Sequence, residues 1–207
     1  MGLDIFGTMV KRVRKNASEP IDLTIEEAAK LADKRAKDKI AKFAKRSLNI
    51  LEHTDSDGYA DAYFKIFSKM GNYTRYEFTY ENMLKEPKPI EEVKKFFDEF
   101  ISRYYAESDV YFRKVNFVYR YFEPYLEDEC CFVTKAQMED LVERCNKVLA
   151  DNSLAEELLP TQSGFFFGST DYDEWYFDDV EDCKRQFSKI LKRFNEDTDI
   201  FYMVMSW

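Results

Sequence analysis

The sequence has 207 residues, a formal net charge of −9 and 45% hydrophobic residues, among them 14 Tyr, 19 Phe and 2 Trp. This length favours one domain, or a core with an added lobe, and is enough to bury an aromatic core without disulfides or metals. Because there is neither an 18-residue apolar run nor a charged-then-apolar leader, the sequence predicts no membrane-spanning segment and no secretion.

The cysteines and the histidine argue against metal and redox chemistry. The four cysteines form no C-x-x-C pair, and His53 is the only histidine. We therefore expect reduced thiols in the cytoplasm, no ordinary zinc site and no cofactor.

The charge is distributed unevenly along the chain. Residues 1–50 contain 12 Lys/Arg and 7 Asp/Glu, a net +5, whereas residues 51–207 contain 19 and 33, a net −14. An acidic body argues against a general nucleic-acid binder, but the basic part leaves room for a local phosphate contact or an acidic protein surface.

The first elements are a strand and a long helix. Gly2–Val13 predicts a strand, and the capping box formed by Thr24 and Glu27 predicts a helix that runs to about His53. Basic residues crowd the surface of this helix: Lys34, Arg35, Lys39, Lys42, Lys45 and Arg46. They form either a solvated face or a docking face for RNA or an acidic partner.

The next segment predicts a mainly helical region. Tyr59–Met70 is typical of a short aromatic helix, and residues 89–105 are typical of an amphipathic one that begins at Pro89. Between them Tyr73–Tyr80 alternates in the manner of a strand. Asp55–Gly58 lacks the ligand spacing of a calcium-binding loop and predicts a turn.

A further helix is predicted over Val110–Phe122, after Ser108 as its cap. On such a helix Arg113, Asn116 and Arg120 would share one side. They would either pair with the acidic run at residues 171–182 or line an anion-binding pocket, and the sequence does not separate these alternatives.

The C-terminal part predicts two strands around two helices. Cys130–Val133 predicts a short strand and Thr134 caps a helix after it. A helix over residues 171–194 and a central strand over Asp199–Trp207 follow. The predicted fold class is α+β, mainly helical, with a small antiparallel or mixed sheet formed by the N- and C-terminal strands.

The stretch from Leu158 to Trp175 differs from the rest of the chain. Pro160 ends a helix, two glycines bracket Phe165–Phe167, and Ser169 or Thr170 would cap the next helix. The three phenylalanines predict a short buried strand or an apolar plug, so the stretch is either a core-filling connector or a binding loop. The candidate binding residues are Arg113, Lys114, Asn116, Arg120, Gln162, Ser163, Gly164, Gly168, Ser169, Thr170, Asp173 and Glu174.

Four features resemble an uncharacterised family of phage, prophage and bacterial proteins. They are the opening Met-Gly-Leu-Asp, the run Tyr111–Asn116, the Leu158–Trp175 stretch, and the aromatic strand Phe201–Trp207 that closes on Trp. The resemblance covers residues 1–14 and 109–207 as a family core, and residues 15–108 would be an inserted, mainly helical lobe. It implies an accessory protein of a phage or mobile element in the cytoplasm of a host cell. It carries no known activity, catalytic residue or cofactor.

No catalytic constellation is visible, so the sequence predicts a non-enzyme. The leading hypothesis is an interaction protein that binds a host protein or nucleoprotein, such as a counter-defence inhibitor of a CRISPR effector. RNA contact through the basic helix is part of this hypothesis. The alternative is a nucleotide-binding or nucleotide-sequestering protein, and a third possibility is a host-derived housekeeping module.

Overall fold

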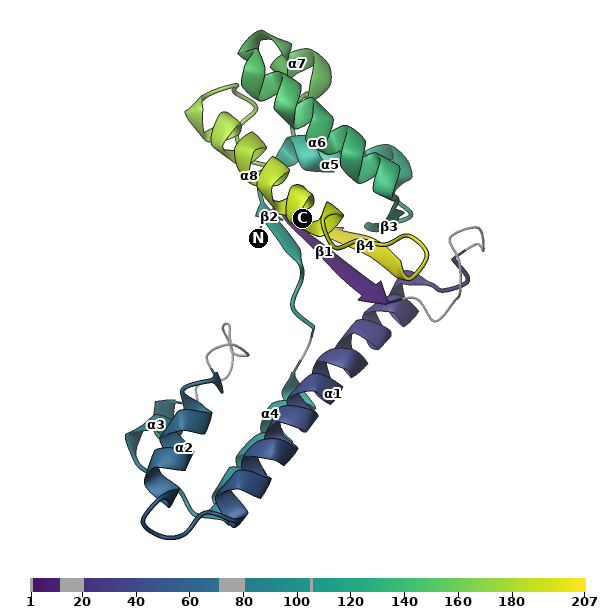
Figure 1. Ribbon diagram of the computed structural model, residues 1–207. Helices are drawn as coiled ribbons and strands as arrows, with labels where there is room; N and C mark the ends of the chain where they lie inside the picture. Colours follow the sequence, from purple (N-terminus) through teal and green to yellow (C-terminus); the bar gives the residue numbers. More distant parts are fainter. Residues whose placement is uncertain (1, 12–20, 71–80, 105) are drawn as a thin grey trace. The chain divides into compact units, whose positions relative to one another are not determined.

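The chain forms two compact units, residues 1–31 with 107–207 (the sheet unit) and residues 32–106 (the helical unit). The computed structural model describes residues 2–11, 21–70, 81–104 and 106–207 (Figure 1). The strand predicted over Tyr73–Tyr80 lies outside the described residues.

The sheet unit is built on four strands: β1 (Asp4–Lys11), β2 (Val110–Arg113), β3 (Cys130–Val133) and β4 (Asp199–Ser206). Their order is β2-β1-β4-β3, and every neighbouring pair is antiparallel. The N- and C-terminal strands are thus the two central ones, and the predicted α+β fold with a small sheet is confirmed.

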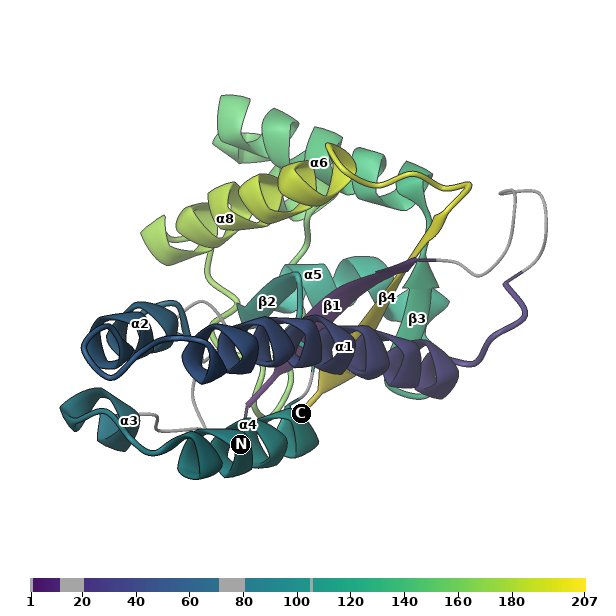
Figure 2. The same ribbon diagram turned by 60° about the horizontal axis from the view of Figure 1, so that its bottom comes forward.

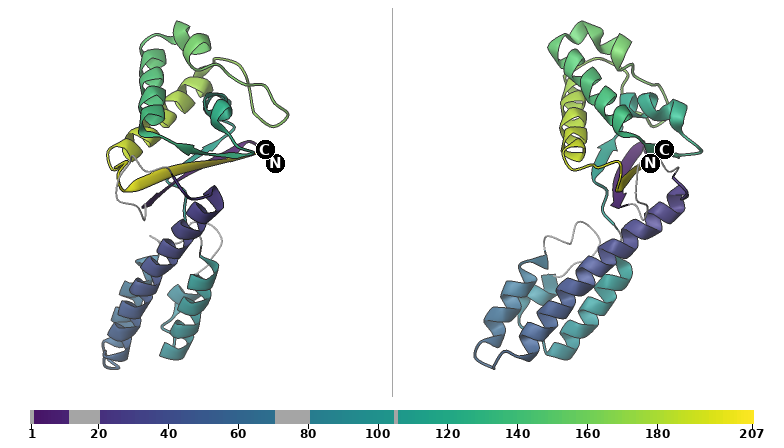
Figure 3. Two further views of the ribbon diagram at one scale, coloured as in Figure 1. Left: turned by 90° about the vertical axis from the view of Figure 1, so that its right-hand side faces the viewer. Right: turned by 45° about the vertical axis from the view of Figure 1, so that its right-hand side comes forward.

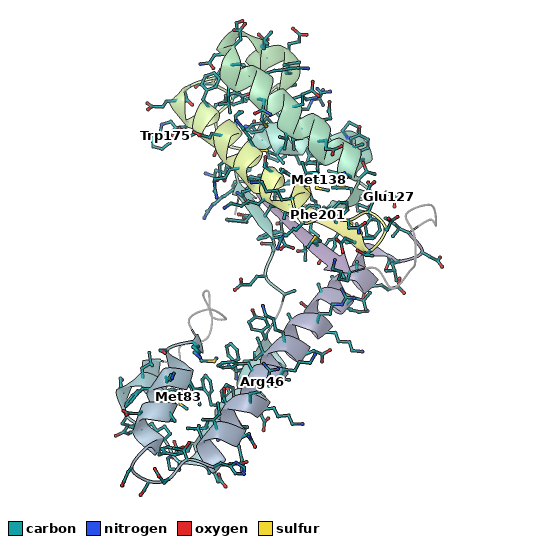
Figure 4. The ribbon with its side chains drawn as sticks, in the orientation of Figure 1. Arg46, Met83, Glu127, Met138, Trp175 and Phe201 are labelled. Atoms are coloured by element: carbon teal, nitrogen blue, oxygen red, sulfur yellow. The ribbon has the colours of Figure 1, made fainter. Side chains whose placement is uncertain are left out.

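Helices cover one face of this sheet. The helices α5 (Asn116–Phe122), α6 (Lys135–Ala150) and α8 (Glu174–Leu191) pack on the side chains that alternate strand positions turn toward them (Figures 1 and 2). Met138 and Phe201, labelled in Figure 4, belong to this core and are 0% and 1% exposed.

The helix predicted over Val110–Phe122 is wrong. Its first part is the strand β2, in which Val110 and Phe112 are buried while Tyr111 and Arg113 are exposed. Lys114 then adopts a left-handed conformation with φ 61°, and α5 begins at Asn116. Because residues 110–122 are apolar or aromatic at most positions, they fit the periodicity of a helix and that of a strand equally well. Pairing with β1 makes the first four residues a strand.

The helix cap predicted at Thr134 is confirmed. Thr134 and Gln137 form the predicted capping box of α6. The short turn after α6 consists of η3 (Asn152–Leu154) and α7 (Ala155–Leu158), and the 3-10 helix η2 (Glu123–Tyr125) follows α5. The helix predicted to begin at residue 171 instead begins at Glu174, because Asp173 is its cap and accepts a hydrogen bond from the Tyr176 backbone N–H at 3.0 Å.

The helical unit contains most of α1 (Ile25–Glu52), with α2 (Tyr59–Phe67), α3 (Glu81–Lys85) and α4 (Ile90–Arg103). The predicted capping box of α1 is present, with hydrogen bonds of 2.8 and 3.2 Å between Thr24 and Glu27. Within the unit α1 and α4 lie side by side (Figure 3), and the aromatic core includes Tyr63, Phe67 and Phe97. No helix in the described part of the chain has the length and apolarity needed to cross a membrane.

Candidate functional site

Residues 162–169 contain a tight turn at Gly164–Phe167 and no strand, so the first of the two predicted forms, a short buried strand, is wrong. We call residues 162–169 the phenylalanine loop. The Phe167 backbone N–H donates to the Gly164 carbonyl at 3.3 Å, which closes the turn. A Cβ on Gly164 would lie 2.6 Å from the ring of Phe167, so only glycine fits against that ring.

The side-chain amide of Asn116, which is only 3% exposed, binds the backbone of the phenylalanine loop through hydrogen bonds. Its Nδ2 donates to the carbonyls of Phe167 at 3.3 Å and Ser169 at 2.7 Å. Its Oδ1 accepts from the Gln162 backbone N–H at 3.3 Å. Both donors of the amide are therefore used by the loop backbone, which satisfies buried polar groups that would otherwise be costly.

A second contact ties the phenylalanine loop to the sheet. Gly168 has φ +93°, and a Cβ there would lie 3.2 Å from both the Cβ and the carbonyl oxygen of Lys114. The Leu3 backbone donates to the Phe166 carbonyl at 3.2 Å and accepts from the Lys114 N–H at 2.7 Å. The end of β2 and the residues before β1 thus fix the loop backbone.

The three phenylalanines of the loop have different environments. Phe167 is 6% exposed and packs edge-on against Tyr119 and Trp207, with ring centroids 4.8 and 5.9 Å away. Phe166 is 36% exposed, and Phe165 is 92% exposed. One ring therefore anchors the loop in the core while another is presented to solvent.

The polar residues around the loop mostly bond to one another. Ser169 forms a serine turn, because its hydroxyl accepts from the Asp171 backbone N–H at 3.1 Å, and it also donates to Asp171 Oδ2 at 3.0 Å. The Thr161 hydroxyl donates to the Thr170 carbonyl at 3.1 Å. Ser163 and Glu174 are exposed, and Trp175 in the first turn of α8 is 77% exposed and projects from the helix end (Figure 4).

The three polar residues expected on one helix side are separated in the structure. Arg113 lies on an exposed position of β2, Asn116 is buried under the loop, and Arg120 is ion-paired with Glu123 at 2.6 Å. Arg120 lines a groove of about 260 Å³ together with Tyr121, Tyr125, Asp140 and Arg144. Since Arg144 also pairs with Asp140, at 2.8 Å, both guanidinium groups of this groove already have carboxylate partners.

The predicted basic docking face lies on α1 within the helical unit. All six of its residues are exposed. Four of them recur at helical spacing along one side of α1 and line a groove of about 450 Å³ with Asp38 and Phe43: Arg35, Lys39, Lys42 and Arg46. We call these four residues the basic stripe. Lys34 and Lys45 lie beside it.

Sequence reasoning missed the clamping role of Asn116 and the exposure of Phe165 and Trp175. In the described part of the chain, no cluster of three or more His, Cys, Asp or Glu side chains could hold a metal ion.

Comparisons of the chain with protein-family models, with curated proteins and with solved structures find no match. The resemblance to the phage and prophage family therefore stays a prediction from the sequence.

Proposed function

We propose that this protein is an interaction protein that inserts Phe165 into an apolar pocket of a protein partner. The observation that carries the proposal is the 92% exposure of Phe165 on a loop whose backbone is held by Asn116 and Gly168. Burial of one such ring is worth about 1.5–3 kcal/mol, and buried aromatic anchors dominate many interfaces.

The rigid backbone of the phenylalanine loop supports this proposal. A loop that is already ordered loses little conformational freedom on binding, so more of the burial energy appears as affinity. Three exposed acidic residues directly follow the loop in sequence, namely Asp171, Asp173 and Glu174. The partner surface that fits is therefore an apolar pocket bordered by Lys and Arg side chains.

The biological role that we propose follows from the family resemblance. The partner is a host protein or nucleoprotein, and the role is counter-defence, with inhibition of a CRISPR effector as the case to test first.

Small-ligand binding is less well supported by the geometry. Three of the donors that a nucleotide site would need are occupied within the chain, because Asn116 holds the loop, Arg120 pairs with Glu123, and the Ser169 hydroxyl donates to Asp171. A thermal-shift screen with nucleotides addresses this alternative, since a ligand at 100 times its dissociation constant adds about 2.7 kcal/mol of stability.

The test of the main proposal is capture from a phage-susceptible host lysate with nuclease, in parallel for the wild type and Phe165→Ala. We expect one protein to be retained by the wild type and lost from the variant. The control is Ile50→Ala, which removes an apolar side chain that is 50% exposed in the helical unit. Equal capture by the wild type and Phe165→Ala would contradict the proposal, as would capture of nothing.

A further inference from the structure

The basic stripe is a regular row of cations. Arg35, Lys39, Lys42 and Arg46 are spaced by four, three and four residues, so they follow one side of α1 for about 16 Å. Their long side chains border the groove of about 450 Å³ that Asp38 and Phe43 complete.

Two cations on α4 of the same unit have carboxylate partners. Lys94 pairs with Glu52 at 2.9 Å, and Arg103 pairs with Glu99 at 2.8 Å. Within the ranges that the structure describes, Arg35, Lys42 and Arg46 have no ion-pair or hydrogen-bond partner. Within the described chain, the charges of these three side chains are thus not neutralised by a partner.

The two units also differ in net charge. The helical unit contains 15 Lys/Arg and 13 Asp/Glu, a net +2, whereas the sheet unit contains 16 and 27, a net −11. The stripe is therefore a positive surface in the one unit whose net charge does not oppose binding of a polyanion.

We propose that the basic stripe binds the sugar–phosphate backbone of a nucleic-acid duplex. A row of cations, of which Arg35, Lys42 and Arg46 have no partner within the described chain, matches the closely spaced charges of a phosphate backbone and gains affinity through counterion release. Phe43 is only partly exposed in the groove, and it is the only ring that lines the groove among the residues that the structure describes. The described part of the stripe therefore offers no platform on which single-stranded bases would stack. The contacts position a duplex without reading its sequence.

This inference concerns a different surface from the phenylalanine loop, and the two are tested separately. The experiment measures fluorescence anisotropy of labelled RNA and DNA duplexes of about 20 base pairs, and of single-stranded RNA, with the full chain. If four cations each contact a phosphate, the affinity for a DNA duplex should fall about 100-fold between about 50 and 200 mM salt.

The decisive variant is Arg35→Gln/Lys42→Gln/Arg46→Gln, which leaves Lys39 as the remaining cation of the stripe. We expect weaker duplex binding and a salt effect reduced to about three- to fourfold over the same range. Because these side chains have no partner within the described chain, the variant should keep its fold, which a thermal melt by circular dichroism checks.

Two further variants separate charge at the stripe from charge in general. Lys184→Gln/Lys189→Gln/Lys192→Gln removes the same charge from α8 and should bind duplexes like the wild type. Arg35→Lys/Arg46→Lys keeps the charge and should also bind like the wild type, because a phosphate contact needs only a cation.

Several outcomes would overturn the inference. They are absence of duplex binding at about 50 mM salt, unchanged binding by the triple stripe variant, and tighter binding of single-stranded RNA than of either duplex. Competition by an acidic peptide as effective as competition by unlabelled duplex would overturn it as well. Phe165→Ala should bind duplexes normally, so failure of one proposal does not imply failure of the other.

Discussion

The phenylalanine loop and the basic stripe both expose side chains to solvent, but different features of the chain position these side chains. The loop has no regular structure, and its shape depends on Asn116, Gly168 and the neighbouring strand end. The stripe depends only on the spacing of charges along a regular helix. A single substitution should therefore disrupt the loop, whereas the stripe should lose function only when several charges are removed together.

The largest expected effect is within the loop itself. Phe167→Ala removes a buried ring and should lower the free energy of unfolding by about 3–5 kcal/mol, whereas Phe165→Ala should change it by less than about 0.5 kcal/mol. Urea unfolding followed by circular dichroism measures both. If both variants lost the same unfolding free energy, the burial of Phe167 and the exposure of Phe165 would be contradicted.

The second effect tests the clamp. Asn116→Ala leaves two loop carbonyls and one backbone N–H without their partner, and should cost about 2–3 kcal/mol of unfolding free energy. Asn116→Asp keeps the shape and the acceptor but loses both donors, so it should also destabilise the protein. If Asn116→Ala lost less than about 0.5 kcal/mol of unfolding free energy, water would replace the three hydrogen bonds of Asn116 without a net cost.

The third effect tests the backbone of the loop. Gly168→Ala places a Cβ at φ +93° and 3.2 Å from Lys114, so it should cost about 1–3 kcal/mol. The matched control is Gly2→Ala, whose Cβ would make an ordinary 3.5 Å contact with Lys114 Cε and should be close to neutral. Chemical unfolding of the two variants side by side gives the comparison, and equal stability would refute the strain argument.

The smallest expected effect concerns a charged residue of α8, Asp179. Burial and the neighbouring Asp182, Asp178 and Asp173 raise the pKa of Asp179 to about 6. Since the folded pKa lies above the unfolded value, ionisation of this group destabilises the fold, and its penalty grows as the pH rises from about 4 to about 6.

Asp179→Asn should therefore raise the unfolding free energy at pH 7–8 by about 1–2 kcal/mol, allowing for partial solvent screening, and leave it unchanged below about pH 4. Urea titrations at both pH values measure this difference. A gain of the same size at low pH would assign the effect to packing rather than to charge.

The parts of the fold that the sequence predicts correctly depend on neighbours in the chain. The capping boxes at Thr24 and Thr134 involve residues three positions apart, so the sequence alone specifies them. The terminal strands were predicted from their apolar pattern, and the sheet places them at its centre.

The features that were missed depend on contacts between distant segments. Whether Phe165 or Phe167 is buried is decided by Asn116, about fifty residues earlier in the chain, and by the rings of Tyr119 and Trp207. Nothing in a run of three identical residues indicates which ring enters the core. The strand β2 was missed for a related reason, because its pairing partner is β1, more than a hundred residues away.

The pairing of β1 with β4 along all eight of its residues has a consequence for the order of folding during synthesis. The helical unit is continuous in sequence from residue 32 to 106 and has its own apolar core, so it can fold as soon as it has emerged from the ribosome. By contrast, β4 follows β1 by nearly two hundred residues, so β1 must wait until β4 has been made before its central pairing exists. Until β4 has been made, β1 therefore lacks its long antiparallel partner, whereas the helical unit already has all of its own core residues.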